Sequence, residues 1–314
     1  MRVLITGVSG FCGRHLVKRL RREQDMEIAG LDMAKPDASQ WGLDRYFQAD
    51  ICDRAEVASR IAEFRPDSIY HLAGINAASS SAGAVCAVNL MGALNVLEAV
   101  RRHAPGCRLL IAGSAAEYGP VPDTALPVTE DVPCRPVGAY GASKYAATMI
   151  TLDYVRKSNL KAVVVRPFNI IGAGIPTTLV VGAMMARAKQ ALESTGEPVV
   201  RVGDSDSERD FISVSDAMDA YVLLLDAEPW GEIVNVCSGR SWPIHHIARA
   251  LLGNSARPIR IEFDPNLIPP SPVRRIYGSN EKARRLIRFE AKMSLEQALS
   301  SIWDSEMGAA VKCA

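Results

Sequence analysis

The chain has 314 residues and carries 36 lysines and arginines against 35 aspartates and glutamates, a net charge of +1. This balance supplies no broad electrostatic field for a polyanion, which argues against a dedicated nucleic-acid or anionic-membrane binder. A chain of this length usually divides into two hydrophobic cores, so we expect two domains. With 48% apolar and 23% charged residues, the composition is that of a globular enzyme.

The N-terminus and the cysteines indicate the compartment. Arg2 to Thr6 run directly into a β-like stretch without the regions of a signal peptide, and no window reaches about 18 uninterrupted apolar residues. The seven cysteines are scattered without a CxxC pair, which favours free thiols. His245 and His246 are adjacent and have no clustered carboxylates nearby. We therefore expect a cytoplasmic protein that spans no membrane and holds no metal.

Short β-branched runs alternate with amphipathic stretches through the first half of the chain. Strands are predicted over 2–6, 27–32, 68–73, 108–114 and 161–168, and helices over 11–22, 54–64, 84–103 and 140–157. This alternation implies right-handed βαβ crossovers and a parallel sheet covered by helices on both faces. The predicted fold class is therefore α/β with a doubly wound parallel sheet.

The alternation loosens after Arg166, and Pro/Gly-rich connections appear. Segments 211–214, 215–225 and 232–237 could return to the sheet, while the rest makes a smaller lobe. We expect residues 1–165 to form the first domain, with 212–238 returning to it. Residues 166–211 and 239–314 are then expected to form a smaller, interleaved α/β domain.

A glycine loop, TGVSGFCG at 6–13, follows the first predicted strand and opens the first helix. Glycine permits the turn and the close approach of a ligand to the backbone, and the helix N-terminus offers free N–H groups to a pyrophosphate. A plain helix cap is the alternative. The order of strand, glycines and helix favours a dinucleotide site at Gly7, Gly10 and Gly13, and hence a Rossmann-type sheet.

Asp32 closes the second predicted strand, about twenty residues beyond the loop, where a carboxylate can accept hydrogen bonds from an adenosine ribose. Its charge would repel a 2′-phosphate, so NAD(H) is favoured, although the nearby Lys35 leaves NADP(H) possible. A solvated loop carboxylate is the alternative. Further along, Asp50 and Ile51 could flank the adenine, and a turn aspartate fits the sequence almost as well.

Tyr140 and Lys144 are four residues apart and therefore lie on one face of a predicted helix. A phenol titrates near 10, and an ammonium at ~4 Å would contribute roughly 4 kcal/mol toward the phenolate at an effective dielectric of ~20. We expect this to lower the pKa of Tyr140 into a working range. Ser114, at the end of a predicted strand, could hydrogen-bond the same substrate oxygen. Together they indicate hydride transfer coupled to proton transfer at a carbinol or ketone.

Motifs along the whole chain resemble the extended short-chain dehydrogenase/reductase family. They are TGVSGFCG at 6–13, HLAG at 71–74, Asn89, SAAEYG at 114–119, YGASK at 140–144, RPFN at 166–169, RDFISVSD at 209–216 and NVCSG at 235–239. Members of this family use a bound nicotinamide dinucleotide to epimerise, dehydrate, reduce or oxidise nucleotide sugars. The resemblance therefore implies a nucleotide-sugar substrate, bound largely by the second domain.

The resemblance also assigns residues. The catalytic set would be Ser114, Tyr140 and Lys144. The cofactor would be bound by Gly7, Gly10, Phe11, Cys12, Gly13, Asp32, Asp50, Ile51, Leu72, Ala73, Gly74, Tyr140 and Lys144. Asn169 and Arg209, with Ser114, would hold the sugar nucleotide, because a guanidinium stays charged and hydrogen-bonds a diphosphate in a fork. For Arg209 the alternative is an ion pair with Asp206 or Asp210.

The resemblance is strongest to GDP-4-keto-6-deoxymannose reductases. Family dehydratases carry acidic residues immediately after the catalytic hydroxyl, whereas this chain has Ala115 and Ala116, which argues against 4,6-dehydratase activity. Two departures affect the substrate site: the segment 75–88 is short, and Pro269-Pro270 stand where relatives carry an arginine. An NAD-dependent 4-epimerase is the main alternative, and a non-catalytic dinucleotide sensor is disfavoured by the intact Tyr140 and Lys144. The helices beginning near Ala84 and Tyr140 could build a homodimer interface.

Overall fold

A computed structural model describes residues 1–34, 42–76, 80–203, 206–267 and 273–311. Within these ranges the main sheet has seven parallel strands in the order β11-β6-β5-β4-β1-β2-β3. The strands are β1 (Arg2–Thr6), β2 (Glu27–Asp32), β3 (Arg45–Gln48), β4 (Ser68–His71), β5 (Arg108–Ala112), β6 (Lys161–Pro167) and β11 (Ile233–Val236). The order reverses direction at β1, which is the Rossmann arrangement predicted from the sequence.

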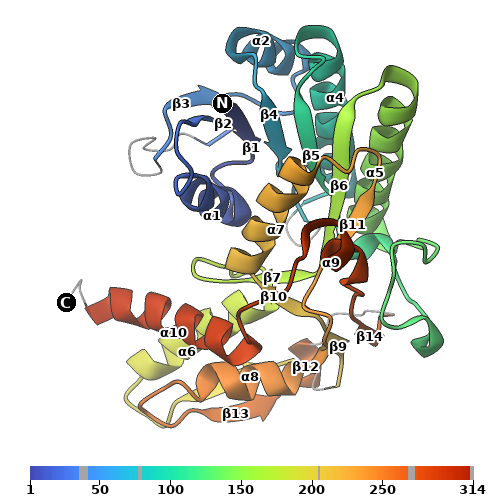
Figure 1. Cartoon of the computed structure of the whole chain (residues 1–314). Coiled ribbons are helices and arrows are strands. Elements are labelled where there is room, and N and C mark those ends of the chain that lie inside the picture. Colours follow the sequence, from blue (N-terminus) through green and yellow to red (C-terminus); the bar gives the residue numbers. More distant parts are fainter. Residues whose placement is uncertain (35–41, 77–79, 204–205, 268–272, 312–314) are drawn as a thin grey trace.

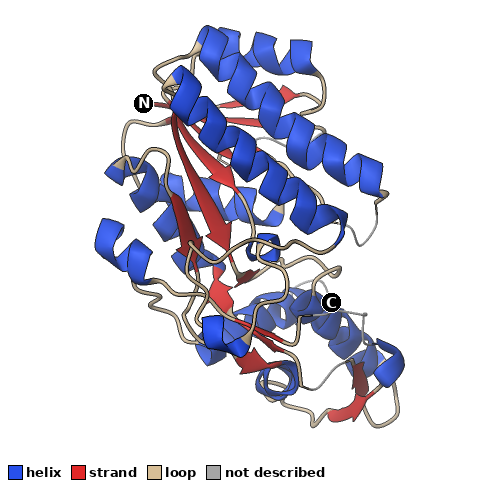
Figure 2. Ribbon diagram, turned by 90° about the vertical axis from the view of Figure 1, so that its right-hand side faces the viewer, coloured by secondary structure: helices blue, strands red, loops and turns tan. Residues whose placement is uncertain are grey.

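Helices cover both faces of this sheet (Figures 1 and 2). One face packs against α1 (Phe11–Leu20), α7 (Val214–Ala227) and α9 (Glu281–Ile287), and the other against α2 (Arg54–Phe64), α4 (Gly92–His103) and α5 (Gly138–Ser158). Alternation along β1 explains the two cores, because Val3 and Ile5 face the first set of helices while Leu4 faces the second. All three of these side chains are fully buried.

Parts of the second half of the chain form a lobe at the lower end of Figure 1, where α6, α8 and α10 gather. Its helices are α6 (Val180–Glu193), α8 (Ile244–Leu252) and α10 (Leu295–Val311). Its strands pair in small sheets: β7 (Asn169–Ile171) with β10 (Phe211–Ser213), β8 (Val199–Val202) with β13 (Arg260–Phe263), and β9 (Glu208–Arg209) with β12 (Trp242–Pro243) and β14 (Arg275–Ile276).

Two of the three segments expected to return to the first domain lie at the main sheet. Strand β11 joins the sheet beside β6, and α7 packs against α1. The strand predicted over 211–214 does not, because β10 pairs with β7 in the small two-stranded sheet. The boundary between the two domains stays a prediction.

The helix predicted over 84–103 is a continuous helical stretch that changes pitch. It runs as α3 (Ala82–Cys86), a π-helical turn (Ala87–Met91) and α4. Among the described residues, this stretch is long and apolar enough to cross a membrane by length and composition alone, which the sequence analysis did not expect. Half of it is buried inside the protein, and core helices pass the same test, so it is weak evidence of a membrane span.

Candidate active site

A cavity of about 690 Å³ opens at the carboxyl ends of the sheet strands. Its wall includes residues that directly follow β1, β4, β5 and β6: Gly7, Leu72, Gly113 and Phe168. Ligands of open α/β sheets bind at this edge. The cavity continues past the catalytic candidates Ser114, Tyr140 and Lys144 to Asn169 and Arg209, which are contributed by the second half of the chain. One cavity thus joins the predicted cofactor and substrate residues.

The glycine loop forms the first end of this cavity, where Gly7, Gly10, Phe11, Cys12 and Gly13 line the wall. Gly7 has φ +71°, and a Cβ there would lie 2.7 Å from the Ala73 backbone. A Cβ at Gly13 would lie 2.5 Å from the Gly7 carbonyl oxygen. The N-cap residue of α1, Gly10, offers no side chain to the first-turn N–H groups. These features fit a bound pyrophosphate, which needs a close backbone and free amides.

Asp32 lies beside this loop rather than in the cavity wall. Its Oδ2 accepts hydrogen bonds from the N–H of Ser9 at 3.0 Å and from the Ser9 hydroxyl at 2.5 Å. Strand pairing explains the approach, because β2 lies next to β1 and both strands end at the same edge. Lys35, which left NADP(H) possible, lies outside the described residues.

Asp50, Ile51 and Ala73 also lie outside the wall, whereas Leu72 and Gly74 line it. Asp50 accepts the N–H of Cys52 at 2.8 Å, which matches the turn aspartate that the sequence allowed. Ile51 is buried in the core, and its carbonyl accepts from Asn95. Ala73 packs against Gly7 and thereby supports the loop. Their proposed contact with the cofactor therefore stays a prediction.

Ser114, Tyr140 and Lys144 meet in the middle of the cavity. Tyr140 and Lys144 lie one turn apart on α5, and Ser114 follows β5. The Lys144 Nζ donates to the carbonyl oxygen of Ala112 at 2.9 Å. The Ser114 Oγ accepts the N–H of Ala116 at 3.1 Å, and the Ser114 side chain acts to lower the pKa of Tyr140. Both hydroxyl groups belong to residues that line this one cavity.

Burial controls the protonation of this group. It raises the pKa of Tyr140, although the hydrogen bond from Ser114 works in the opposite direction. Burial also lowers the pKa of Lys144 to about 8. The expectation that Lys144 would bring the pKa of Tyr140 down is therefore wrong for this structure. Burial of the phenolate raises the pKa by more than Ser114 lowers it.

The far end of the cavity carries the substrate candidates. Asn169 donates its Nδ2 to the carbonyl oxygen of Asp210 at 2.7 Å, which ties β7 to β10. Arg209 donates to the carbonyl oxygens of Glu208, Val273 and Arg274, so its guanidinium is held at the cavity wall. Pro269 and Pro270 lie outside the described residues.

The wall has a clear charge pattern. Among the described residues that line it, the charged side chains are Lys144 and Arg209, and none is a carboxylate. Ala115 and Ala116 line the cavity beside Ser114, whereas Glu117 is fully buried behind them. The arrangement suits an anionic ligand and gives no acid to assist loss of water at this point.

Several wall residues escaped the sequence analysis. Apolar side chains of the second half, among them Ile170, Ile175 and Val273, line the substrate end, and Tyr221 approaches from α7. They carry no chemical signature, so spacing could not reveal them. Asn89 was noted only as part of a motif. Its amide bonds both the N–H and the carbonyl of Ile75 and donates to the Ser143 hydroxyl, fixing the wall segment that contains Ile75 and Asn76.

A family model and curated relatives both match most of this chain. The model of the NAD dependent epimerase/dehydratase family matches residues 3–237. Among curated proteins, the GDP-6-deoxy-D-mannose reductase of Pseudomonas aeruginosa is 29% identical, covering 98% of this chain and 98% of that protein.

Solved structures are similar over the same length. RMD from Pseudomonas aeruginosa, complexed with NADPH, has a TM-score of 0.83 at 28% identity and covers 98% of this chain and 99% of that one. The UDP-glucose 4-epimerase of Thermus thermophilus, complexed with NAD, has a TM-score of 0.86 at 27% identity and covers 98% and 100%. Reductases and epimerases therefore share this fold and differ in what their sites do.

Proposed function

The chain belongs to the NAD dependent epimerase/dehydratase family, and we propose that within it this protein is a reductase that converts the C4 ketone of a GDP-4-keto-6-deoxyhexose into an alcohol. The observation that carries this proposal is the single cavity in which the Ser114 and Tyr140 side chains lie between the glycine loop and Arg209. A hydroxyl pair in that position can meet a substrate oxygen while the two ends hold the cofactor and the nucleotide.

The dinucleotide, when bound, supplies the hydride for the reduction. Tyr140 then donates its phenolic proton to the oxygen that becomes the alcohol, and Ser114 holds that oxygen with its hydroxyl. The raised pKa of Tyr140 suits a proton donor, because the phenol stays protonated at neutral pH. Lys144 lies one turn from Tyr140 on α5 and is fixed by the Ala112 carbonyl. Its positive charge would offset part of the cost of burying the phenolate left after transfer.

Cofactor binding is assigned to the glycine loop, with Asp32 choosing between dinucleotides. The free amides of α1 would hold the pyrophosphate. A carboxylate accepts from ribose hydroxyls and repels a 2′-phosphate, so we propose that NADH is preferred and NADPH tolerated. Relatives with this fold have been solved with NADPH and with NAD, so the family allows either choice.

The substrate end is assigned to Asn169 and Arg209. Within the part of the chain that the structure describes, the wall is cationic and carries no carboxylate, which supports a diphosphate ligand. Ala115 and Ala116 beside the Ser114 hydroxyl support a reduction over a 4,6-dehydration, which needs an acid there. A GDP-linked substrate is supported by the similarity to the GDP-6-deoxy-D-mannose reductase.

We also propose the two-domain division at 1–165 with 212–238, against 166–211 with 239–314, and a homodimer built by α4 and α5. Met91, the last residue of the π-helical turn before α4, and Met149, on α5, support the dimer, because these large apolar side chains are 47% and 41% exposed. The mass in solution, measured by light scattering, tests the dimer, and a monomer at micromolar concentration would exclude it.

A 4-epimerase is the competing function, because it needs the same residues and room to rotate a keto intermediate. The two differ in cofactor use: a reductase consumes NADH in every cycle, and an epimerase retains NAD. The decisive assay follows NADH absorbance with GDP-4-keto-6-deoxymannose. We expect one NADH oxidised per sugar reduced, and interconversion of two sugar nucleotides without net NADH consumption would contradict the proposal.

Tyr140→Phe tests the proton donor in the same assay. Losing a positioned general acid costs about 10²–10⁴-fold in rate, so we expect kcat to fall by that amount while NADH still binds. Tyr145→Phe is the matched control, because it removes a phenol from the next turn of the same helix, outside the cavity wall. Equal kcat values for the two variants would remove Tyr140 from the mechanism.

A further inference from the structure

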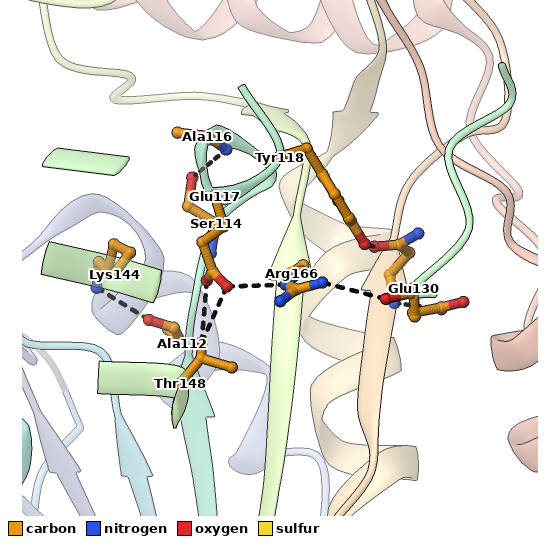
Figure 3. A network of polar contacts seen from close by, with 10 residues as sticks. Ala112, Ser114, Ala116, Glu117, Tyr118, Glu130, Lys144, Thr148 and Arg166 are labelled. Atoms are coloured by element: carbon orange, nitrogen blue, oxygen red, sulfur yellow. Dashed lines mark hydrogen bonds and ion pairs between the residues drawn. The ribbon is translucent and has the colours of Figure 1, made fainter. Parts of the chain in front are cut away.

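The end of β5 and the turn that follows it pack against one face of α5. Figure 3 labels Lys144 and Thr148 of α5 together with the residues to which they are bonded. Tyr140, Lys144 and Thr148 repeat every four residues and therefore share that face. The stretch from Ala112 to Glu117 meets this face: the Ala112 carbonyl accepts from Lys144, and the Glu117 carboxylate accepts from Thr148. The Ser114 side chain acts to lower the pKa of Tyr140. Two of these three residues of α5 are the catalytic candidates.

Glu117 provides the contact that lies outside the cavity. It is fully buried and contributes nothing to the cavity wall, so it cannot touch a substrate there. Its Oε1 accepts the N–H of Ser114 at 2.8 Å, and its Oε2 accepts the Nε of Arg166 at 2.8 Å. The carboxylate therefore holds the backbone of Ser114 by a hydrogen bond on the side away from the cavity.

Arg166, on β6, anchors this carboxylate to the sheet. Its side chain is 2% exposed and lies over the Tyr118 ring, 4.7 Å from the centroid. A buried carboxylate needs a paired charge and hydrogen bonds to compensate for lost water. Arg166, Thr148 and the Ser114 amide provide them from three separate segments, so the position of Glu117 is determined from three directions.

Two glycines allow the turn Ala115–Glu117 to pack closely against its neighbours. A Cβ at Gly113 would lie 2.4 Å from the Glu117 Oε1, and a Cβ at Gly141 would lie 2.6 Å from the Ala116 carbonyl oxygen. Gly141 directly follows Tyr140, so the turn at Ala115–Glu117 packs against the backbone of the catalytic helix. Any shift of this turn would move the Ser114 hydroxyl relative to Tyr140.

We propose that Glu117 is a positioning residue for the reaction: held by Arg166 and Thr148, it fixes the turn that presents the Ser114 hydroxyl to Tyr140. This inference rests on the proposed function, because it assigns a role relative to a catalytic Ser114 and Tyr140. A purely structural ion pair is the competing account, and it would affect stability without changing turnover by folded enzyme.

Thr148→Val is the main test, because it removes one hydrogen bond to Glu117 while keeping the shape of the side chain and the charge pair. Thr151→Val is the matched control: Thr151 is equally buried on α5, but its hydroxyl donates to the Ala147 carbonyl. Small errors of alignment cost large factors in rate, so we expect kcat of Thr148→Val to fall by about tenfold. KM for GDP-4-keto-6-deoxymannose should stay unchanged. If kcat of Thr148→Val equals that of Thr151→Val, the proposal is overturned.

Glu117→Gln adds a second readout, the pH dependence of kcat. The titratable groups around Tyr140 are Cys12, Tyr221, Lys144 and Glu117. The Glu117 charge raises the pKa of both Tyr140 and Lys144, so removing it should move the high-pH decline of kcat to lower pH. An unmoved decline would contradict the proposal. Should this variant fail to fold, Thr148→Val decides alone.

Amide hydrogen exchange separates this inference from the proposed function, because it needs no substrate. In the NADH-bound protein, the peptide spanning residues 112–119 should exchange faster in Thr148→Val than in Thr151→Val. Equal exchange would overturn the positioning role whatever the enzyme reduces. If Thr148→Val exchanges faster but the wild-type protein does not oxidise NADH with GDP-4-keto-6-deoxymannose, the positioning geometry is kept and the proposed substrate is rejected.

Discussion

Asp32 and Ser9 are joined by two hydrogen bonds, because one carboxylate oxygen accepts both the backbone N–H and the hydroxyl of the serine. The other oxygen accepts the N–H of Ala34 at 3.2 Å. The β2 end is thus fastened to the glycine loop, and the Gly7 N–H strengthens the connection by donating to the Leu31 carbonyl at 2.9 Å. The carboxylate consequently has a fixed position beside the loop that is proposed to bind the dinucleotide.

Asp32→Asn should weaken the preference for NADH over NADPH. The variant keeps an acceptor for Ser9 but loses the charge that repels a 2′-phosphate and strengthens the bond to ribose. Hydrogen bonds to charged groups contribute about 1.5–3 kcal/mol, so the ratio of kcat/KM for NADH to that for NADPH should fall by roughly tenfold or more. Asp123→Asn, at an exposed position outside the cavity wall, is the control and should leave the ratio unchanged. An unchanged ratio in Asp32→Asn would mean that other groups choose the cofactor.

Arg209→Lys should weaken nucleotide binding without affecting the cofactor. A lysine keeps the positive charge but loses the guanidinium that donates to the Val273 and Arg274 carbonyls and that is proposed to bind the diphosphate. We expect the Kd for GDP, measured by calorimetry, to rise by about tenfold, while the Kd for NADH stays constant. Arg201→Lys is the control, because that side chain is 67% exposed and pairs with Glu262. Unaltered GDP affinity in Arg209→Lys would place the diphosphate elsewhere.

His71 should make the fold sensitive to acid. Burial lowers the pKa of this histidine from 6.5 to about 3, and its ring bonds the Thr6 hydroxyl at 2.8 Å. The unfolded chain takes up the proton first, so the stability that the neutral ring contributes is complete above pH 6.5 and is lost as the pH falls toward 3. At pH 5 the loss should reach about 2 kcal/mol, from 1.36 kcal/mol per pKa unit.

Urea unfolding at pH 7 and pH 5 checks this value. His71→Asn, which keeps a polar group for Thr6, should lose less stability between the two pH values than the wild type does. His103→Asn, at an exposed position, should lose as much as the wild type. Equal losses in all three proteins would show that His71 does not account for the acid sensitivity.

Local signals predicted the elements that a short stretch of chain can specify. The ranges of β1, β2 and α2 agree with the sequence analysis. β1 and β2 are continuous runs buried on both faces, and the buried residues of α2 recur with helical spacing. The strand β3 was not among the predicted ranges. Its sequence is RYFQ, with a polar residue at each end and one buried side chain, Phe47, so it shows no apolar run or alternation. β10 was predicted as a strand but placed in the wrong sheet, because partner choice depends on residues far along the chain.

By itself the sequence determined the α/β class, the glycine loop and the tyrosine–lysine pair, since each depends on neighbours within one strand, turn or helix. Only the tertiary structure decided which residues share the cavity and how they are charged. Arg166 reaches Glu117 across 49 positions, and Asp32 reaches Ser9 across 23. Burial then raised the pKa of Tyr140 against the sequence-based expectation. The physical reason is common to these cases: desolvation and long-range contacts exist only after the sheet has brought distant segments together.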